Sequence, residues 1–186
     1  MKIQIDQSGK IEDTARNTVI AYSNDKQKAI LITRKTKRQM QETFRLCGAI
    51  RLFIYFTFAI GIYYLIEDLR GSSIIIIDLE YYGKDKIITR IINKLLDENH
   101  RPKHSIKFAR IGNRPRVHYT AKNVFDGKKK ANRTISFKEL IKQIKKTDGR
   151  LRECFETLVG AQSRSVKHRI SRNKLNVKTL KNKAKK

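Results

Sequence analysis

Cysteine is scarce in this 186-residue chain, which limits the chemistry that the chain can support. The two cysteines, Cys47 and Cys154, lie far apart in the sequence and form no CxxC pair. The sequence therefore offers no cysteine-based metal site, and it favours a reducing, cytoplasmic environment. The first residues already have the pattern of a strand, so we expect no cleavable signal peptide.

Motifs for nucleotide cofactors and for serine or cysteine hydrolases are absent as well. The sequence contains neither GxGxxG nor GxxxxGK[ST], and it has no GxSxG elbow. Its four histidines are scattered and suggest no catalytic triad. These absences argue against dinucleotide-dependent enzymes, P-loop enzymes and triad hydrolases.

Long hydrophobic runs are also missing. The longest uncharged segment, Leu52–Ile66, has 15 residues, whereas a helix needs about 20 to cross a bilayer. We therefore expect a buried core helix and no membrane partner. A small membrane-attached protein, anchored through this segment, is an alternative interpretation.

Acidic residues are few, and the balance is strongly basic. Lysine and arginine number 43 against 17 acidic residues, which gives a formal net charge of +26. Such a charge predicts a polyanionic partner, and we expect DNA or RNA. Residues 149–186 carry only two acids, Glu153 and Glu156. We therefore divide the chain into a folded domain, residues 1–148, and a basic C-terminal extension, residues 149–186, which is partly helical or disordered.

Hydrophobic periodicity predicts five strands. Three short alternating runs with short connections indicate an antiparallel meander, and the isoleucine run that comes later is typical of a parallel strand buried on both faces. The strands are expected at Met1–Asp6, Thr18–Tyr22, Ala29–Thr33, Ile74–Ile77 and Ser105–Gly112.

Helical periodicity separates and follows these strands, and Ser136 with Glu139 matches a capping box. The helices are expected at Arg34–Cys47, Leu52–Ile66, Lys84–Asn99, Arg114–Phe125 and from Ser136 onward. A meander followed by βαβ crossovers predicts an α/β fold with a mixed five-stranded sheet and helices on both faces.

Three carboxylates lie where this fold would bring them together. Asp6 ends the first strand, and Asp78 and Glu80 end the isoleucine strand. If the two strands are parallel neighbours, their carboxyl ends meet at one edge of the sheet. Clustered carboxylates bind hard cations, so we expect a Mg²⁺ or Mn²⁺ site at Asp6, Asp78 and Glu80. Alternatively, Asp6 merely precedes a turn, and the other two acids pair with Lys84 or Lys86.

The stretch "IDQSGK" at the first strand, together with the element order, resembles the ribonuclease H-like superfamily. It is similar to the "IDESG" opening of an uncharacterised family of that superfamily, and the acids after "IIIID" resemble those of RuvC-type Holliday junction resolvases. The resemblance covers roughly residues 1–130 as topology, with a short matching motif. It implies a metal-dependent nuclease or junction resolvase that hydrolyses phosphodiesters in structured nucleic acid, and it implies a homodimer.

By this resemblance, Asp6 is the metal ligand of the first strand, and Asp78 or Glu80 is the ligand of the fourth. Family members complete the site from a late helix with Asp or His, and His118 is the candidate there. It would ligate a metal or move a proton. Asp126 and Glu42 are the other carboxylates that would complete the site.

Basic residues in three segments of the chain are candidates for phosphate contacts. They are Lys35, Lys37, Arg38, Arg114, Arg116, Lys128, Lys129 and Lys130. Tyr81 and Tyr82 are candidates for base stacking. A non-catalytic nucleic-acid-binding protein, such as a ribosome- or nucleoid-associated one, is the alternative function.

Overall fold

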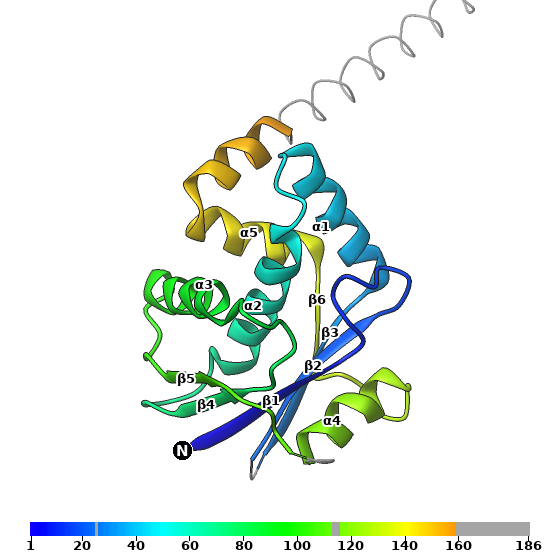
Figure 1. Cartoon of the computed structure of the whole chain (residues 1–186), viewed down its shortest axis with the longest axis vertical. Coiled ribbons are helices and arrows are strands. Elements are labelled where there is room, and N and C mark those ends of the chain that lie inside the picture. The colour runs from blue at the N-terminus through cyan, green and yellow to red at the C-terminus, as the bar shows by residue number, and fades with distance from the viewer. Residues whose placement is uncertain (25, 113–115, 159–186) are drawn as a thin grey trace, which may run out of the picture.

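Six strands form one mixed sheet in a computed structural model that describes residues 1–24, 26–112 and 116–158 (Figure 1). The sheet order is β5-β4-β1-β2-β3-β6. The strands are β1 (Lys2–Ser8), β2 (Thr18–Ser23), β3 (Gln27–Ile32), β4 (Ile74–Ile77), β5 (Ser105–Phe108) and β6 (Arg133–Ile135). The predicted α/β class is confirmed, but the predicted count of five strands is wrong. The additional strand, β6, pairs parallel with β3 at the sheet edge.

The central strand β1 lies between an antiparallel and a parallel neighbour. It pairs antiparallel with β2 and parallel with β4, where Ile5 lies opposite Ile77. This is the neighbour relation that the sequence predicted. Ile3 and Ile5 are fully buried in the main core. Because side chains alternate along a strand, Asp6 points to the opposite face of the sheet.

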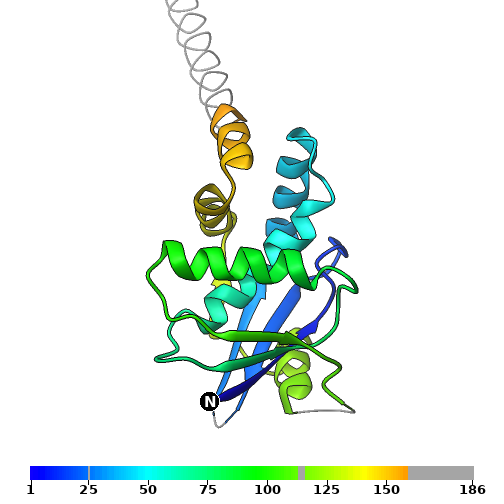
Figure 2. The ribbon, with the colours of Figure 1, turned by 60° about the vertical axis from the view of Figure 1, so that its left-hand side comes forward.

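Helices cover the two faces of this sheet unequally. Helices α1, α2, α3, α5 and the helix of residues 149–158 pack around the main core on one face, whereas α4 contacts β1, β2 and β3 on the other (Figure 2). The helices are α1 (Arg34–Leu46), α2 (Leu52–Ile66), α3 (Asp85–Glu98), α4 (Arg116–Phe125) and α5 (Phe137–Thr147). The predicted capping box of Ser136 and Glu139 is present at the start of α5.

Helix α2 is the centre of the main core. It is apolar on all sides, and a helix of that kind must be surrounded; β2 and β3 lie against it, as do α1, α3 and α5. Gly61 lets it approach the sheet, since an added Cβ would lie 2.6 Å from Ile20 Cδ1. Within the described residues, no helix has both the length and the apolar character needed to cross a membrane.

The isoleucine strand β4 is buried more on one face than on the other. Ile75 and Ile77 are fully buried in the main core, but Ile74 is 44% exposed and Ile76 is half-buried. The prediction that this strand is buried on both faces is therefore wrong for Ile74. The reason is that α4 lies over β1, β2 and β3 and does not extend over β4.

The core continues past residue 148. Residues 149–158 form a helix whose Leu151 and Phe155 are buried in the main core. A disulfide joins Cys154 of this helix to Cys47 at the end of α1. The expectation of a reducing environment rested on the number and spacing of the cysteines, and this disulfide speaks against it. Residues 159–186 lie outside the described residues.

Candidate metal centre

Asp6, Asp78 and Glu80 converge beside the carboxyl ends of β1 and β4. Each offers one carboxylate oxygen, and these three oxygens lie within 4.8 Å of one another. Asp6 lies within β1 and not at its end, and Asp78 directly follows β4. The parallel register carries them together, because Ile5 pairs with Ile77 and the Asp78 N–H donates to the Ile5 carbonyl at 2.9 Å.

Glu80 joins the cluster through a turn of the chain. The sequence placed it on the strand with Asp78, but β4 ends at Ile77. The Glu80 N–H donates to the Asp78 carbonyl at 2.9 Å, which folds the chain back after the strand. The two acids therefore share one side because of this turn and not because of strand alternation.

Asp6 is the most buried member of the cluster, at 7% exposure. Burial raises the pKa of its carboxyl, and the hydrogen bond from the Gln7 N–H, 2.7 Å from Oδ1, opposes this rise. Its Oδ2 lies 3.1 Å from His118 Nδ1. The carboxylate of Asp78 is held by the Ile111 N–H, which donates to its Oδ1 at 2.9 Å. Backbone donors thus hold both aspartates at fixed positions.

Glu80 shows that the three carboxylates repel one another. Burial, followed by the charges of Asp6 and Asp78, raises its pKa to about 7, while the charge of Lys10 lowers it. Among the ion pairs of the described residues, none includes Asp78 or Glu80, so the alternative pairing with Lys84 or Lys86 does not occur there. Oxygen ligands at this spacing suit a hard divalent cation, which would offset the repulsion.

Helix α4 brings His118 to the site. Val117 and Ala121 pack on Val19 and Ala21 of the sheet, and this contact turns the neighbouring His118 toward Asp6. Gly9 permits the docking of the far end of the helix, because an added Cβ would lie 2.5 Å from Phe125 Cε2. Gly9 also has a φ of 75°, which favours glycine.

The other two carboxylates considered for the site lie elsewhere. Asp126 forms an ion pair with Lys122 at 3.0 Å, one turn away on α4. Glu42 forms an ion pair with Arg45 on the exposed side of α1. Of the three candidates, His118 is the one that contacts the acidic cluster.

Lys37 is not available to phosphate, so its predicted role is wrong. Its side chain is fully buried, and its ammonium donates to the Lys10 carbonyl at 2.7 Å, the Asp13 carbonyl at 2.6 Å and Thr18 Oγ1 at 2.8 Å. Burial lowers its pKa to about 8. Lys37 instead fastens the β1–β2 loop to α1.

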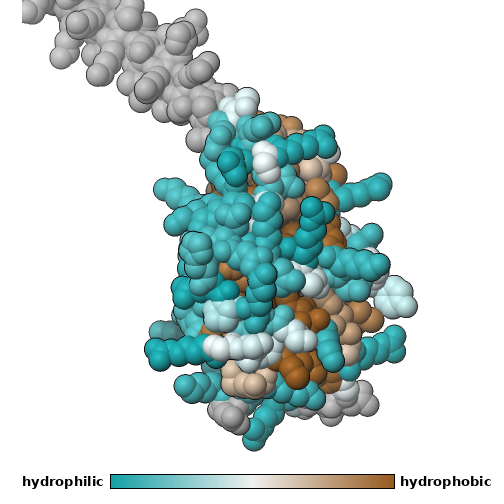
Figure 3. Space-filling model, turned by 90° about the vertical axis from the view of Figure 1, so that its left-hand side faces the viewer, coloured by the Kyte–Doolittle hydropathy of each residue, from teal (hydrophilic) through white to brown (hydrophobic). Residues whose placement is uncertain are grey.

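The remaining predicted phosphate contacts lie at the surface. Arg114 lies outside the described residues. The exposed ones are Lys35, Arg38, Arg116, Lys128, Lys129 and Lys130. Hydrophilic side chains cover most of the face in Figure 3, with apolar side chains visible between them.

The two tyrosines considered for base stacking differ. Tyr81 packs edge-on against Phe58, and its hydroxyl accepts hydrogen bonds from Gln7 Nε2 and the Ile11 N–H, both at 3.3 Å. It therefore supports the β1–β2 loop, and its role in base stacking stays a prediction. Tyr82 is 84% exposed, so its ring is open to a ligand.

Sequence reasoning overlooked Lys10, the cation whose charge acts on Glu80. It belongs to the same "IDQSGK" stretch that contains Asp6, so its closeness in sequence to the acid was an available signal.

No protein-family model matches this chain, and neither a curated protein nor a solved structure matches it.

Proposed function

We propose that this protein is a divalent-metal-dependent nuclease that hydrolyses phosphodiesters in structured DNA or RNA. The convergence of Asp6, Asp78 and Glu80 within 4.8 Å is the observation that carries the proposal. Three carboxylates held this close repel one another unless a cation offsets their charge. Membership of the ribonuclease H-like superfamily is part of the proposal, and the position of β4 parallel beside the central β1 supports it.

The three carboxylates would hold Mg²⁺ or Mn²⁺ through oxygen ligands. When bound, such ions activate a water molecule and stabilise the leaving oxygen of a phosphodiester. The backbone donors to Asp6 and Asp78 keep these ligands in place before substrate arrives. Lys10 offsets part of the negative charge, so the cluster stays compatible with an approaching phosphate.

His118 would orient the cluster and move a proton. Its Nδ1 faces Asp6 Oδ2, which leaves Nε2 to exchange a proton with the substrate or with water. The side chain is 43% exposed, so a bound nucleic acid can reach it.

The exposed basic residues of α4 and the turn after it would position the substrate. Arg116 lies two residues before His118, and Lys128, Lys129 and Lys130 follow the far end of the same helix. Contacts of this kind bind phosphate without reading sequence. They predict that affinity falls steeply with salt concentration.

Cleavage by an Asp6→Asn variant tests this function. Wild-type protein is incubated with Mg²⁺ or Mn²⁺ and with linear and branched DNA and RNA, and binding is measured separately in EDTA. We expect Asp6→Asn to abolish cleavage and to retain binding, while Asp126→Asn, which alters a surface ion pair, behaves as wild type. Unchanged cleavage by Asp6→Asn would remove the proposed site. Binding by the wild type without turnover on any substrate would favour the non-catalytic nucleic-acid-binding protein.

A further inference from the structure

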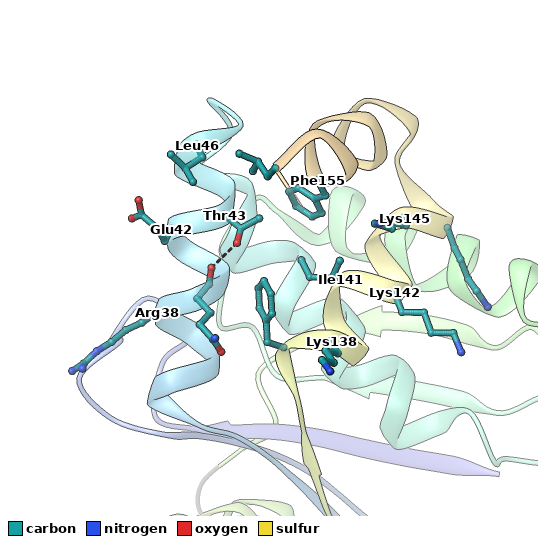
Figure 4. Close-up of a pocket in the computed structure, with 13 residues that line it drawn as sticks. Arg38, Glu42, Thr43, Leu46, Lys138, Ile141, Lys142, Lys145 and Phe155 are labelled. Atoms are coloured by element: carbon teal, nitrogen blue, oxygen red, sulfur yellow. Dashed lines mark hydrogen bonds between the residues drawn. The ribbon is translucent and has the colours of Figure 1, made fainter. Parts of the chain in front are cut away.

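A second surface, separate from the acidic cluster, has the features of a binding groove. It lies between α1 on one side and α5 with the helix 149–158 on the other, and it has a volume of about 960 Å³. Its apolar lining comes from all three helices. The apolar residues are Leu46, Phe137, Ile141, Phe155 and Leu158. Figure 4 shows Ile141 and Phe155 pointing into the space between the helices.

The groove is bordered by positive charge. Its basic residues are Arg38, Lys138, Lys142, Lys145 and Lys146. The one acidic residue of its lining, Glu42, is already paired with Arg45. Lys145 has a partner in Glu156 at 3.6 Å, whereas Lys138 and Lys142 are exposed and one turn apart on α5. The rim therefore attracts a negatively charged occupant.

The walls of the groove are held in place before any ligand binds. The disulfide between Cys47 and Cys154 joins the two walls, next to Leu46 on one side and Phe155 on the other. Phe155 is fully buried and packs edge-on against Phe44 of α1, with ring centroids 5.4 Å apart. A surface that is ordered in the free protein loses less entropy on binding.

We propose that this groove binds an acidic amphipathic helix of a partner protein. The lining residues of α5 run from Phe137 to Lys146, which is about 13 Å along a helix axis and matches two to three turns of a bound helix. Apolar side chains at i, i+3, i+4 and i+7 of the partner would enter the groove, and its acids would meet the basic rim.

The charges and the rings disfavour other occupants. The chain's own residues 164–186 carry ten basic residues and no acid, so the rim repels them. A single-stranded nucleic acid would need several open ring faces for stacking, whereas of the two rings in the lining Phe155 is fully buried and Phe137 is half-buried. A fatty acid carries one negative charge at one end, whereas the basic residues here are spread along α5 and also occur on α1.

Binding of two synthetic helical peptides tests this proposal. Both carry leucine at i, i+3, i+4 and i+7, and one has glutamate while the other has lysine at all flanking positions. Binding to the full-length, disulfide-bonded protein is measured by fluorescence anisotropy. We expect the glutamate peptide to bind at least tenfold more tightly than the lysine peptide.

Substitutions locate the binding on the groove. Leu46 is 59% exposed, so Leu46→Glu leaves the core intact and is expected to weaken the glutamate peptide at least tenfold. Lys94→Glu on α3 makes the same charge change as Lys142→Glu but outside the groove, so only Lys142→Glu should weaken binding. Circular dichroism confirms folding, and Leu46→Glu is expected to retain metal-dependent cleavage.

Several results would overturn the proposal. Equal binding by Leu46→Glu and wild type would show that the acidic peptide meets basic charge elsewhere. A dimer of the wild type that Leu46→Glu abolishes in sedimentation would make the groove a contact between two copies of this chain. Displacement of the peptide by decanoate would assign the groove to a fatty acid. Displacement by a single-stranded oligonucleotide would assign it to nucleic acid, provided that Leu46→Glu also abolishes binding of the oligonucleotide.

Discussion

Replacing Glu80 with glutamine should stabilise the metal-free protein at pH 8 and leave its stability at pH 4 unchanged. Burial, followed by the charges of Asp6 and Asp78, raises the pKa of Glu80 from 4.5 to about 7. Below pH 4.5, the carboxyl is protonated in both the folded and the unfolded chain. Between pH 4.5 and 7, the unfolded chain releases this proton first, so the free energy of unfolding falls as pH rises. Above pH 7, the full destabilisation is present.

The size of the effect follows from the same pKa. A rise from 4.5 to about 7 corresponds to about 3 kcal/mol between the two states. Because Glu80 is only half-buried, solvent screening reduces this to roughly 1–2 kcal/mol. For a chain of this size, each kcal/mol shifts the melting temperature by about 2–4 °C. Glu80→Gln should therefore melt a few degrees above wild type at pH 8.

Thermal melts followed by circular dichroism, in EDTA at pH 4 and pH 8, measure this difference. Glu98→Gln serves as the matched control, because Glu98 is an exposed carboxylate on α3. A gain that is equal at both pH values would refute the reasoning, as would an equal gain in the control. Added Mg²⁺ should reverse the order at pH 8, since the cation stabilises the wild-type cluster more than the variant.

Two further predictions concern Lys37 and His118. Lys37→Met should lower the free energy of unfolding by roughly 2–4 kcal/mol, because two backbone carbonyls and a hydroxyl lose their buried donor. Urea denaturation measures this free energy, and the control Lys35→Met, at an exposed position of α1, should unfold with nearly the wild-type free energy. Equal losses of stability in the two variants would contradict the buried role of Lys37. His118→Ala should slow cleavage about 10²–10⁴-fold, with Mn²⁺ affinity reduced far less than by Asp6→Asn. Single-turnover kinetics and calorimetry separate the two effects, and an unchanged rate would show that His118 moves no proton.

The strands that carry the site could be predicted from the sequence because their signals are local. Four successive isoleucines directly precede Asp78, which predicts a buried parallel strand, and its pairing with β1 was the condition under which the acids would meet. The adjacency of Asp6 and Asp78 follows from that pairing. The prediction that Glu80 joins the two aspartates is confirmed, but the predicted cause, alternation along a strand, is wrong. A turn brings Glu80 there, and a turn has no periodic pattern from which its direction could be inferred.

The features that sequence reasoning missed depend on contacts between distant segments. Strand β6 has three residues after a run of lysines, too few to show alternation. Lys37 looks like one more cation on a basic helix, and its burial depends on carbonyls of a loop 24 and 27 residues earlier in the chain. The disulfide joins cysteines 107 residues apart, and no local pattern links them.

The most direct test of the metal centre is anomalous X-ray diffraction from crystals soaked in Mn²⁺. We expect an anomalous peak among the carboxylates of Asp6, Asp78 and Glu80, and its loss in crystals of Asp6→Asn. Crystals that show no peak at these carboxylates, with Mn²⁺ bound elsewhere or not at all, would contradict the proposed metal centre.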